Sequence, residues 1–157
     1  MTSDAGQGPV LDQPDLLYTD TIRINAELYP GKAAVVCDDE RLSWADFHRR
    51  TNMVANGLLD RGLKRGDKVC LVMNSSVIMF ELIWGIIKAG GVVVPLNVMM
   101  AGESLGITIN DCDAEILFAD ASTRDKVDAV RGALSHVSRN GFYLAGGAHD
   151  DWASAEA

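Results

Sequence analysis

The sequence of 157 residues lacks the short glycine-rich signatures with which many nucleotide-binding folds hold phosphate. It contains neither G-x-G-x-x-G nor G-x-x-x-x-G-K-[ST], so neither familiar phosphate loop is present. It also has no G-x-S-x-G elbow, which would expose a nucleophilic serine. From residue chemistry alone we therefore predict no catalytic, no cofactor-binding and no metal-binding residue.

Cysteine and basic residues are also scarce. The three cysteines (Cys37, Cys70 and Cys112) are odd in number and have no C-x-x-C spacing, so we expect buried free thiols in a reducing, cytoplasmic setting. Lysine and arginine total 14 against 22 aspartate and glutamate, a net charge of −8. This balance argues against a nucleic-acid partner and against an anionic membrane surface, because both require a basic face.

Long hydrophobic runs are absent as well. The most apolar stretch is interrupted by Glu81 and Lys88, so no segment reaches the ~18 apolar residues of a membrane span. The first 15 residues have neither the basic nor the apolar region of a signal peptide. We expect a soluble chain with no membrane span.

Other polar groups have a structural role as their better explanation. The histidines His48, His136 and His149 do not have metal-ligand spacing, and Asp38-Asp39-Glu40 is typical of a solvated turn rather than a cation site. Capping is favoured over catalysis for the remaining groups: Asp111, Asp113, Gly90-Gly91, Ser43, Ser75, Ser76, Ser104 and Ser122. Core packing is favoured for Trp44 and Trp84.

The stretch from Lys68 to Asn97 organises the predicted fold. It predicts a strand at residues 68–73, a helix at residues 77–89 and a strand at residues 92–94. The helix is apolar on almost every side and must be covered on almost every side. The uninterrupted valines 92–94 predict a strand buried on both faces, parallel to the first.

The flanking segments alternate between helix and strand patterns. A helix is expected from Asp15 to Pro30-Gly31, then a hairpin through residues 33–42, then a helix capped by Ser43 that ends near residue 60. Residues 103–110 fit a helix, although a strand stays open, and residues 114–119 fit a strand. A last helix, capped by Ser122 or Thr123, carries an apolar face through residue 137, and a short apolar run follows at 142–144.

This alternation predicts an α/β fold with a largely parallel sheet and flanking helices. By length the chain forms one domain. We divide it into a mobile leader at residues 1–14, a domain at residues 15–147 and a frayed tail or linker at residues 148–157.

Several ordered blocks between residues 15 and 121 resemble the N-terminal portion of the adenylate-forming acyl-CoA synthetases. Residues 29–35 (YPGKAAV) are similar to the P-x-K-x-A opening, and residues 42–47 (LSWADF) to the L-T-Y-x-E-L block. Residues 87–97 (IKAGGVVVPLN) resemble the K-A-G-x-x-x-x-P-hydrophobic-N block, and residues 111–117 (DCDAEIL) the D-S-x-A-K block. Residues 52–57 and 63–69 follow the run that ends in G-D-x-V. Asn97 leans toward the acyl-CoA ligases over peptide-synthetase domains.

The resemblance implies that the chain is an incomplete part of the large N-terminal domain of this fold. The family activates a carboxylate with ATP and Mg²⁺ to an acyl-adenylate, and CoA thiol then displaces AMP. The family's phosphate loop, adenine block, ribose aspartate, hinge and catalytic lysine have no counterpart in this sequence. No catalytic residue is therefore carried over, and ATP, Mg²⁺ and CoA are implied only for the full-length enzyme.

Two hypotheses follow. The first is an N-terminal fragment of a fatty-acid-CoA ligase, inactive alone, whose partner is the remainder of the ligase or a second copy of itself. The second is a non-catalytic binding or regulatory module that pairs with another chain. Incomplete cover of the apolar helix predicts oligomerisation or aggregation of the isolated chain, and a stand-alone nucleotide-binding domain is the least favoured alternative.

Overall fold

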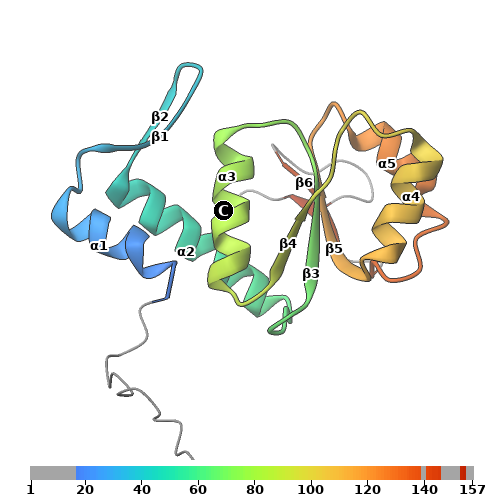
Figure 1. Cartoon of the computed structure of the whole chain (residues 1–157), viewed down its shortest axis with the longest axis horizontal. Helices are drawn as coiled ribbons and strands as arrows, with labels where there is room; N and C mark the ends of the chain where they lie inside the picture. The colour runs from blue at the N-terminus through green and yellow to red at the C-terminus, as the bar shows by residue number, and fades with distance from the viewer. Residues whose placement is uncertain (1–16, 139–140, 146–152, 155–157) are drawn as a thin grey trace, which may run out of the picture.

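The computed structural model describes residues 17–138, 141–145 and 153–154 (Figure 1). The predicted leader and most of the predicted tail lie outside these ranges. Along the described chain the elements follow in the order α1 (Asp20–Leu28), β1 (Ala33–Cys37), β2 (Glu40–Ser43), α2 (Trp44–Asp60), β3 (Lys68–Val72), α3 (Val77–Lys88), β4 (Val92–Pro95), α4 (Gly102–Asp111), β5 (Ala114–Ala119), α5 (Arg124–Arg131), β6 (Phe142–Leu144) and β7 (Ala153–Ser154).

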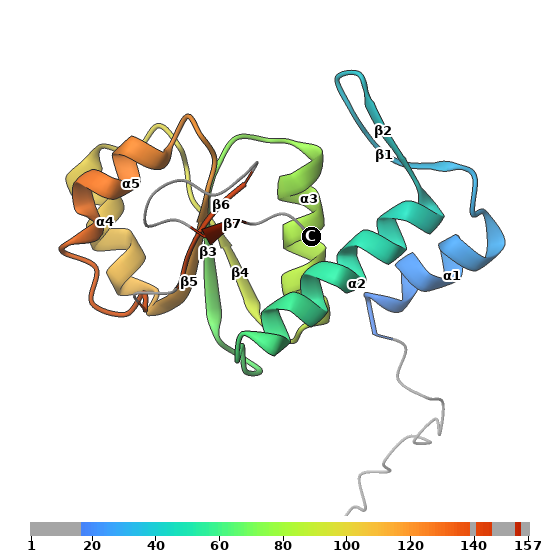
Figure 2. The same cartoon turned by 180° about the vertical axis from the view of Figure 1, so that it is seen from behind.

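Five strands form one sheet in the order β4-β3-β5-β6-β7, and every neighbouring pair is parallel. Helix α3 joins β3 to β4, so the predicted strand–helix–strand unit with parallel strands is confirmed. Helices α2 and α3 lie on one side of the sheet, and α4 and α5 lie on the other (Figure 2). The predicted α/β class, with a largely parallel sheet and flanking helices, is therefore confirmed.

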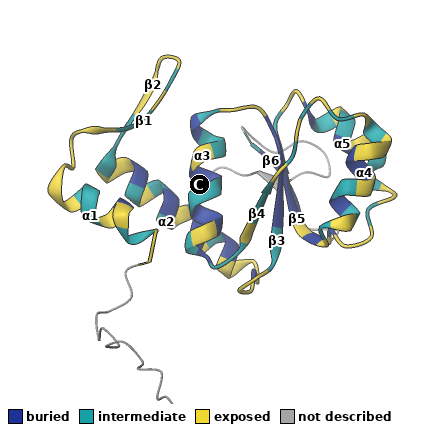
Figure 3. Ribbon diagram, viewed as in Figure 1, coloured by how far each residue is buried: buried dark blue, intermediate teal, exposed yellow. Residues whose placement is uncertain are grey.

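Each face of the sheet has its own core, because successive side chains of a strand point to opposite faces. On β3, Val69 and Leu71 join the core under α2 and α3. Cys70 and Val72 of the same strand join the core under α4 and α5. The buried residues drawn in Figure 3 accordingly follow the middle of the sheet and the inner sides of the helices.

Strand β4 differs from its prediction. It is the edge strand, and its four residues run exposed, intermediate, intermediate, exposed, with Val92 46% exposed. The prediction that Val92–Val94 is buried on both faces is therefore wrong. A run of valines indicates a strand, but only a neighbour on each side buries it.

Helix α3 begins and ends as predicted. The Ser76 hydroxyl accepts a hydrogen bond from the Met79 backbone N–H at 3.1 Å, and Gly90 follows the helix with a φ of +83°. The cover is incomplete, because Phe80 is 40% exposed and Ile87 36% exposed. No helix in the described part of the chain combines the length and apolar character needed to cross a bilayer.

Gly85 sets the contact between α2 and α3. A Cβ placed there would lie 2.3 Å from Val54 Cγ1 of α2, far inside van der Waals contact. Glycine in a helix costs about 1 kcal/mol relative to alanine. The residue is therefore explained by the close approach of the two helices.

The N-terminal segment forms α1 and a two-stranded antiparallel sheet of β1 and β2, as the predicted hairpin requires. Helix α1 begins at Asp20, and Ile22 is its buried residue. The predicted start of this helix, Asp15, lies outside the described residues. The Ser43 cap of α2 is confirmed, since its hydroxyl accepts from the Asp46 backbone N–H at 3.1 Å.

The segment at residues 102–111 is a helix, which decides the choice left open between helix and strand. Helix α5 ends at Arg131, so the prediction of a helical face through Leu134 and Val137 is wrong. Both residues still pack against the α4–α5 side core from the turns that follow, with Val137 9% exposed. The spacing of these two residues therefore indicated that they are buried, but not that they belong to a helix.

Candidate functional site

The histidines considered above as metal ligands are dispersed over the fold. His48 lies on α2, whereas His136 lies in the segment that follows α5. Nε2 of His136 is 3.3 Å from Oδ1 of Asp113. His149 lies outside the described residues. Over the ranges that the structure describes, no three His, Cys, Asp or Glu side chains gather as a metal site requires. The structure thus gives His48 and His136 separate surroundings.

Several of the predicted structural roles are confirmed. Gly90 adopts the left-handed conformation that a helix C-terminus favours, and Ser43 and Ser76 are N-caps. Asp38 lies in the turn between β1 and β2, with a φ of +50°. Capping by Asp111 stays a prediction.

The cysteines are free thiols, but only one is buried. Cys70 is buried on β3, whereas Cys37 and Cys112 are partly exposed. The sulfur atoms of Cys70 and Cys112 lie 3.4 Å apart without a bond. Burial, together with the neighbouring Cys112, raises the pKa of the Cys70 thiol far above its usual range, which disfavours the reactive thiolate form.

In doubly wound parallel sheets, ligands commonly bind at the carboxyl ends of the strands, where the connections leave in opposite directions. In this sheet that point lies between β3 and β5, because β3 connects to its neighbour β4 whereas β5 connects to β6 on the other side. The loops that follow these strands begin at Met73 and Asp120. A ligand site predicted from the topology of the sheet would therefore lie between the loops that follow β3 and β5.

Asp120 joins the two loops. Its Oδ2 accepts from the Asn74 backbone N–H at 2.6 Å, and its Oδ1 accepts from the backbone N–H groups of Ser122 and Thr123 at 2.9 and 3.0 Å. The Thr123 hydroxyl donates to the carbonyl of Val72. Thr123 is the N-cap residue of α5, one of the two predicted, but its side chain makes no capping hydrogen bond, and the carboxylate of Asp120 accepts the backbone donors that precede the helix.

Electrostatics fit this role. Desolvation alone would raise the pKa of Asp120, but hydrogen bonds from Ser122, Asn74 and Thr123 outweigh it and hold the pKa below its ordinary value of 3.8. Asn74 Nδ2 donates to the Ser122 hydroxyl at 2.8 Å, and the Ser76 hydroxyl is used by its own helix. This donor set does not fit a nucleotide phosphate or Mg²⁺, and no reaction step is assigned to it.

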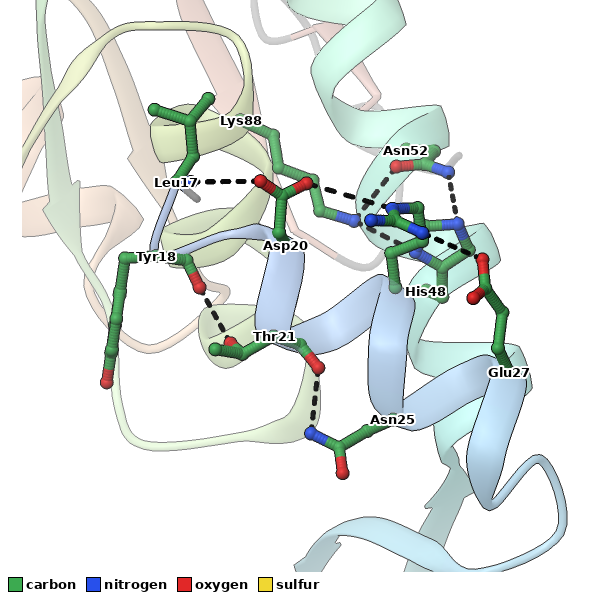
Figure 4. A network of polar contacts seen from close by, with 10 residues as sticks. Leu17, Tyr18, Asp20, Thr21, Asn25, Glu27, His48, Asn52 and Lys88 are labelled. Carbon is green, nitrogen blue, oxygen red and sulfur yellow. Dashed lines mark hydrogen bonds and ion pairs between the residues drawn. The ribbon is translucent and has the colours of Figure 1, made fainter. Parts of the chain in front are cut away.

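A second polar place lies between α1, α2 and α3. It is a surface hollow of about 290 Å³ lined by Thr19, Asp20, Arg23, His48, Asn52, Ala55, Asn56, Leu59 and Lys88. Arg23 lies 3.7 Å from Asp20 and 2.9 Å from Glu27, both on its own helix. Figure 4 shows Lys88 with His48 and Asn52, and it labels Asp20 and Glu27 of α1 in the same view.

Lys88 is the best-connected group of the hollow. Its Nζ donates to Thr51 Oγ1 at 2.8 Å and to Asn52 Oδ1 at 2.9 Å, and it lies 3.4 Å from His48 Nδ1. Burial lowers the pKa of Lys88 from 10.5 to about 8. Burial, together with the nearby Lys88 and Arg23, also lowers the pKa of His48.

Sequence reasoning missed both Asp120 and Lys88 as polar centres. Asp120 follows a predicted strand at the position where loop side chains meet, and this place was a usable signal. Lys88 was noted only as a charge interrupting an apolar helix. Its partners lie at least 36 positions away, so local spacing carried no signal for them.

Comparison with known proteins identifies the family. The model of the AMP-binding enzyme family matches residues 22–156. The medium/long-chain-fatty-acid–CoA/3-oxocholest-4-en-26-oate–CoA ligase of Mycobacterium tuberculosis is 30% identical over 108 residues, 69% of this chain and 20% of that protein. Malpinin synthetase of Mortierella alpina is 34% identical over 112 residues, 71% of this chain and 1% of that protein.

Solved structures agree. A protein of Rhodopseudomonas palustris described as a long-chain-fatty-acid CoA ligase superposes with a TM-score of 0.83 at 28% identity, covering 89% of this chain and 35% of the other. The fatty acyl CoA synthetase of Mycobacterium tuberculosis superposes with a TM-score of 0.68 at 29% identity, covering 72% of this chain and 23% of the other. The chain thus spans about a third or less of the relatives it matches. With the family model matched over most of its length, the chain belongs to the AMP-binding enzyme family.

Proposed function

We propose that this chain supplies the opening scaffold of an ATP-dependent acyl-CoA ligase, in a reducing cytoplasmic setting, and that it is inactive alone. In the whole enzyme a fatty carboxylate would be converted to an acyl-adenylate, and CoA thiol would displace AMP. The observation that carries the proposal is the superposition on the Rhodopseudomonas palustris protein, which covers 89% of this chain and 35% of that one.

The chemistry of the described residues supports the inactivity. The sequence has no phosphate loop, and at the carboxyl ends of β3 and β5 the carboxylate of Asp120 accepts the backbone N–H groups of Asn74 and Thr123. A phosphoryl-transfer site needs preorganised positive charge or donors aimed at the phosphate. Those groups would come from the remainder of the ligase.

A chimera tests the scaffold role. Residues 17–145 replace the aligned segment of the Rhodopseudomonas palustris protein, and pyrophosphate release is followed with ATP, Mg²⁺ and a panel of fatty acids. We expect turnover by the chimera and by the unaltered ligase, and only background from the isolated chain. A ligase lacking the segment is the negative control.

The outcomes separate the two parts of the proposal. A soluble, folded chimera without turnover contradicts the scaffold role. Pyrophosphate release by the isolated chain above background contradicts its inactivity.

The second candidate is a non-catalytic module that pairs with another chain. The exposed valine of the edge strand, Val92, and the exposed Phe80 and Ile87 of α3 favour it, because apolar surface of this kind is often covered by a partner. Size-exclusion chromatography with light scattering over a range of concentrations tests self-pairing. A monomer at every concentration would count against a second copy as that partner.

A further inference from the structure

The amine of Lys88 closes a ring of three polar side chains (Figure 4). Lys88 Nζ lies 2.9 Å from Asn52 Oδ1, Asn52 Nδ2 lies 3.2 Å from His48 Nε2, and His48 Nδ1 lies 3.4 Å from Lys88 Nζ. Thr51 Oγ1 accepts a further bond from the amine at 2.8 Å. Helix α2 supplies three of these side chains, and α3 supplies the lysine.

Counting donors fixes the protonation state that satisfies this ring. A neutral imidazole has one N–H and one acceptor nitrogen, and an amide offers one donor atom and one acceptor atom. Each therefore donates to one neighbour in the ring and accepts from the other. The third member must do the same, and an ammonium group has no lone pair with which to accept.

The conclusion does not depend on how the imidazole and amide are oriented. In the orientation given above, Asn52 donates to His48, and His48 Nδ1–H points at Lys88. With the amide turned over, His48 donates to Asn52, and Asn52 donates to Lys88. Both arrangements are fully satisfied by a neutral amine, whereas an ammonium group faces one donor in either case.

We propose that Lys88 is a modification site, at which its uncharged amine is acylated by small activated acyl donors of the thioester class that enter the hollow. The lone pair of Nζ attacks the thioester carbonyl carbon, the C–N bond forms and the C–S bond breaks. The electron pair of the broken bond leaves with sulfur, and the proton lost by nitrogen passes to the thiolate. The products are an amide on Lys88 and a free thiol.

The surroundings favour this reactivity. The charged or titratable groups lining the hollow are Asp20 and Arg23 on α1, His48 on α2 and Lys88 itself on α3. The ion pairs of the described residues give Lys88 no carboxylate within 4.0 Å, and burial lowers the pKa of its amine to about 8. At pH 8 about half of this amine is uncharged, against less than about 1% of an ordinary lysine.

Access is through the open hollow, since Lys88 lines it and is only half-buried. In the first of the two orientations, the lone pair accepts across the longest contact of the ring, 3.4 Å from His48 Nδ1, so it is weakly held there. The proposal does not rest on the ligase function proposed above.

The test is a competition between lysines of the full chain. The protein is exposed briefly to S-acetyl-N-acetylcysteamine between pH 6.5 and 10, and acetylation is quantified by mass spectrometry of Glu-C peptides. We expect Lys88 to react ~10-fold faster than exposed Lys64 at pH 8, with a rate midpoint near pH 8, because desolvated lysines are better nucleophiles at this pH. Equal or slower reaction at Lys88 overturns the proposal.

Two isosteric variants test the ring. Asn52→Asp puts a carboxylate beside the amine and favours the ammonium form, so Lys88 acetylation at pH 8 should fall ~10-fold and its midpoint should rise. Asn56→Asp adds the same charge to the hollow outside the ring, and we expect less than a ~2-fold change. Equal slowing by both variants assigns the effect to charge alone and overturns the role of the ring.

Discussion

Strands β3 and β4 lie side by side, are joined by one helix and are both rich in valine, yet their environments differ. Val69, Cys70, Leu71 and Val72 of β3 are all 0% exposed, whereas Val92 of β4 is 46% exposed. β3 pairs with a strand on each side, and β4 pairs with β3 alone within the described residues. Place in the sheet, more than composition, therefore decides burial.

The two strands also end differently. The loop after β3 is joined to the loop after β5 by the carboxylate of Asp120. The loop after β4 has a local bond, from the Met99 backbone N–H to Asn97 Oδ1 at 2.9 Å, and one bond from α5, in which Lys126 Nζ donates to the Val98 carbonyl. Both loops are therefore bonded to distant segments, but only at the centre does one carboxylate join the loops of two neighbouring strands.

A matched pair of truncations should show the largest effect of this contrast. Val69→Ala removes two buried methyl groups from the α2–α3 side core and should lower the free energy of unfolding by about 2 kcal/mol. Val92→Ala should lower it by only about 0.5 kcal/mol, because half of that side chain is already in water. Urea unfolding followed by circular dichroism measures both values, and equal losses would remove the distinction between centre and edge.

The connection at the carboxyl ends should contribute less. Asp120→Asn replaces one acceptor oxygen by a donor that faces backbone N–H groups, so the free energy of unfolding at pH 7 should fall by about 1–2 kcal/mol. Asp39→Asn, in the exposed hairpin turn, serves as the control, and we expect it to change the free energy of unfolding by less than about 0.5 kcal/mol.

This effect should depend on pH. Because the pKa of Asp120 is depressed in the folded state, its carboxylate stabilises the fold above pH 3.8, and this stabilisation is lost as pH falls through the depressed pKa. Unfolding curves at pH 7, 4 and 2.5 should therefore show wild type and Asp120→Asn converging toward low pH. A gap that is constant across this range would contradict the linkage.

The smallest effect on folding is expected at the edge itself. Val92→Lys should change the free energy of unfolding by less than about 0.5 kcal/mol, because the position is half exposed. A charge on an edge strand opposes pairing with another strand, so any concentration-dependent association should weaken in light scattering. Unchanged association would assign the contact to another surface, such as the exposed face of α3.

The sequence predicted the elements well where the signals were local. The Ser43 and Ser76 caps, the glycine after α3 and the valine-rich strands all follow from contacts within a few residues. The family followed from ordered blocks, each weak by itself. Burial of β4 was predicted wrongly because the order of strands depends on pairing between segments far apart in the chain.

The partners of the two polar centres were out of reach for the same reason, although the place of Asp120 after a predicted strand was a usable signal. Asp120 bonds across 46 positions to Asn74, and Lys88 bonds across 37 positions to Thr51. The lowered pKa of Lys88 arises from burial, which exists only after α2 and α3 have packed. Neither the distant bonds nor the lowered pKa corresponds to a periodicity or spacing in the sequence.

Because Gly85 has no side chain, it helps to set the distance between α2 and α3, and with it the position of the segments packed on α2. Val54 occupies the volume that a larger side chain at position 85 would need, so the separation of α2 and α3 is set where these two residues meet. Helix α1 and the β1–β2 hairpin lie beside α2 on the side away from the sheet (Figure 2), and Tyr18 also stacks on Trp84 of α3, so their distance from the sheet depends in part on that contact between α2 and α3. The residues at positions 54 and 85 should therefore vary together among relatives, and a change there should alter the width of the hollow between α2 and Lys88 of α3.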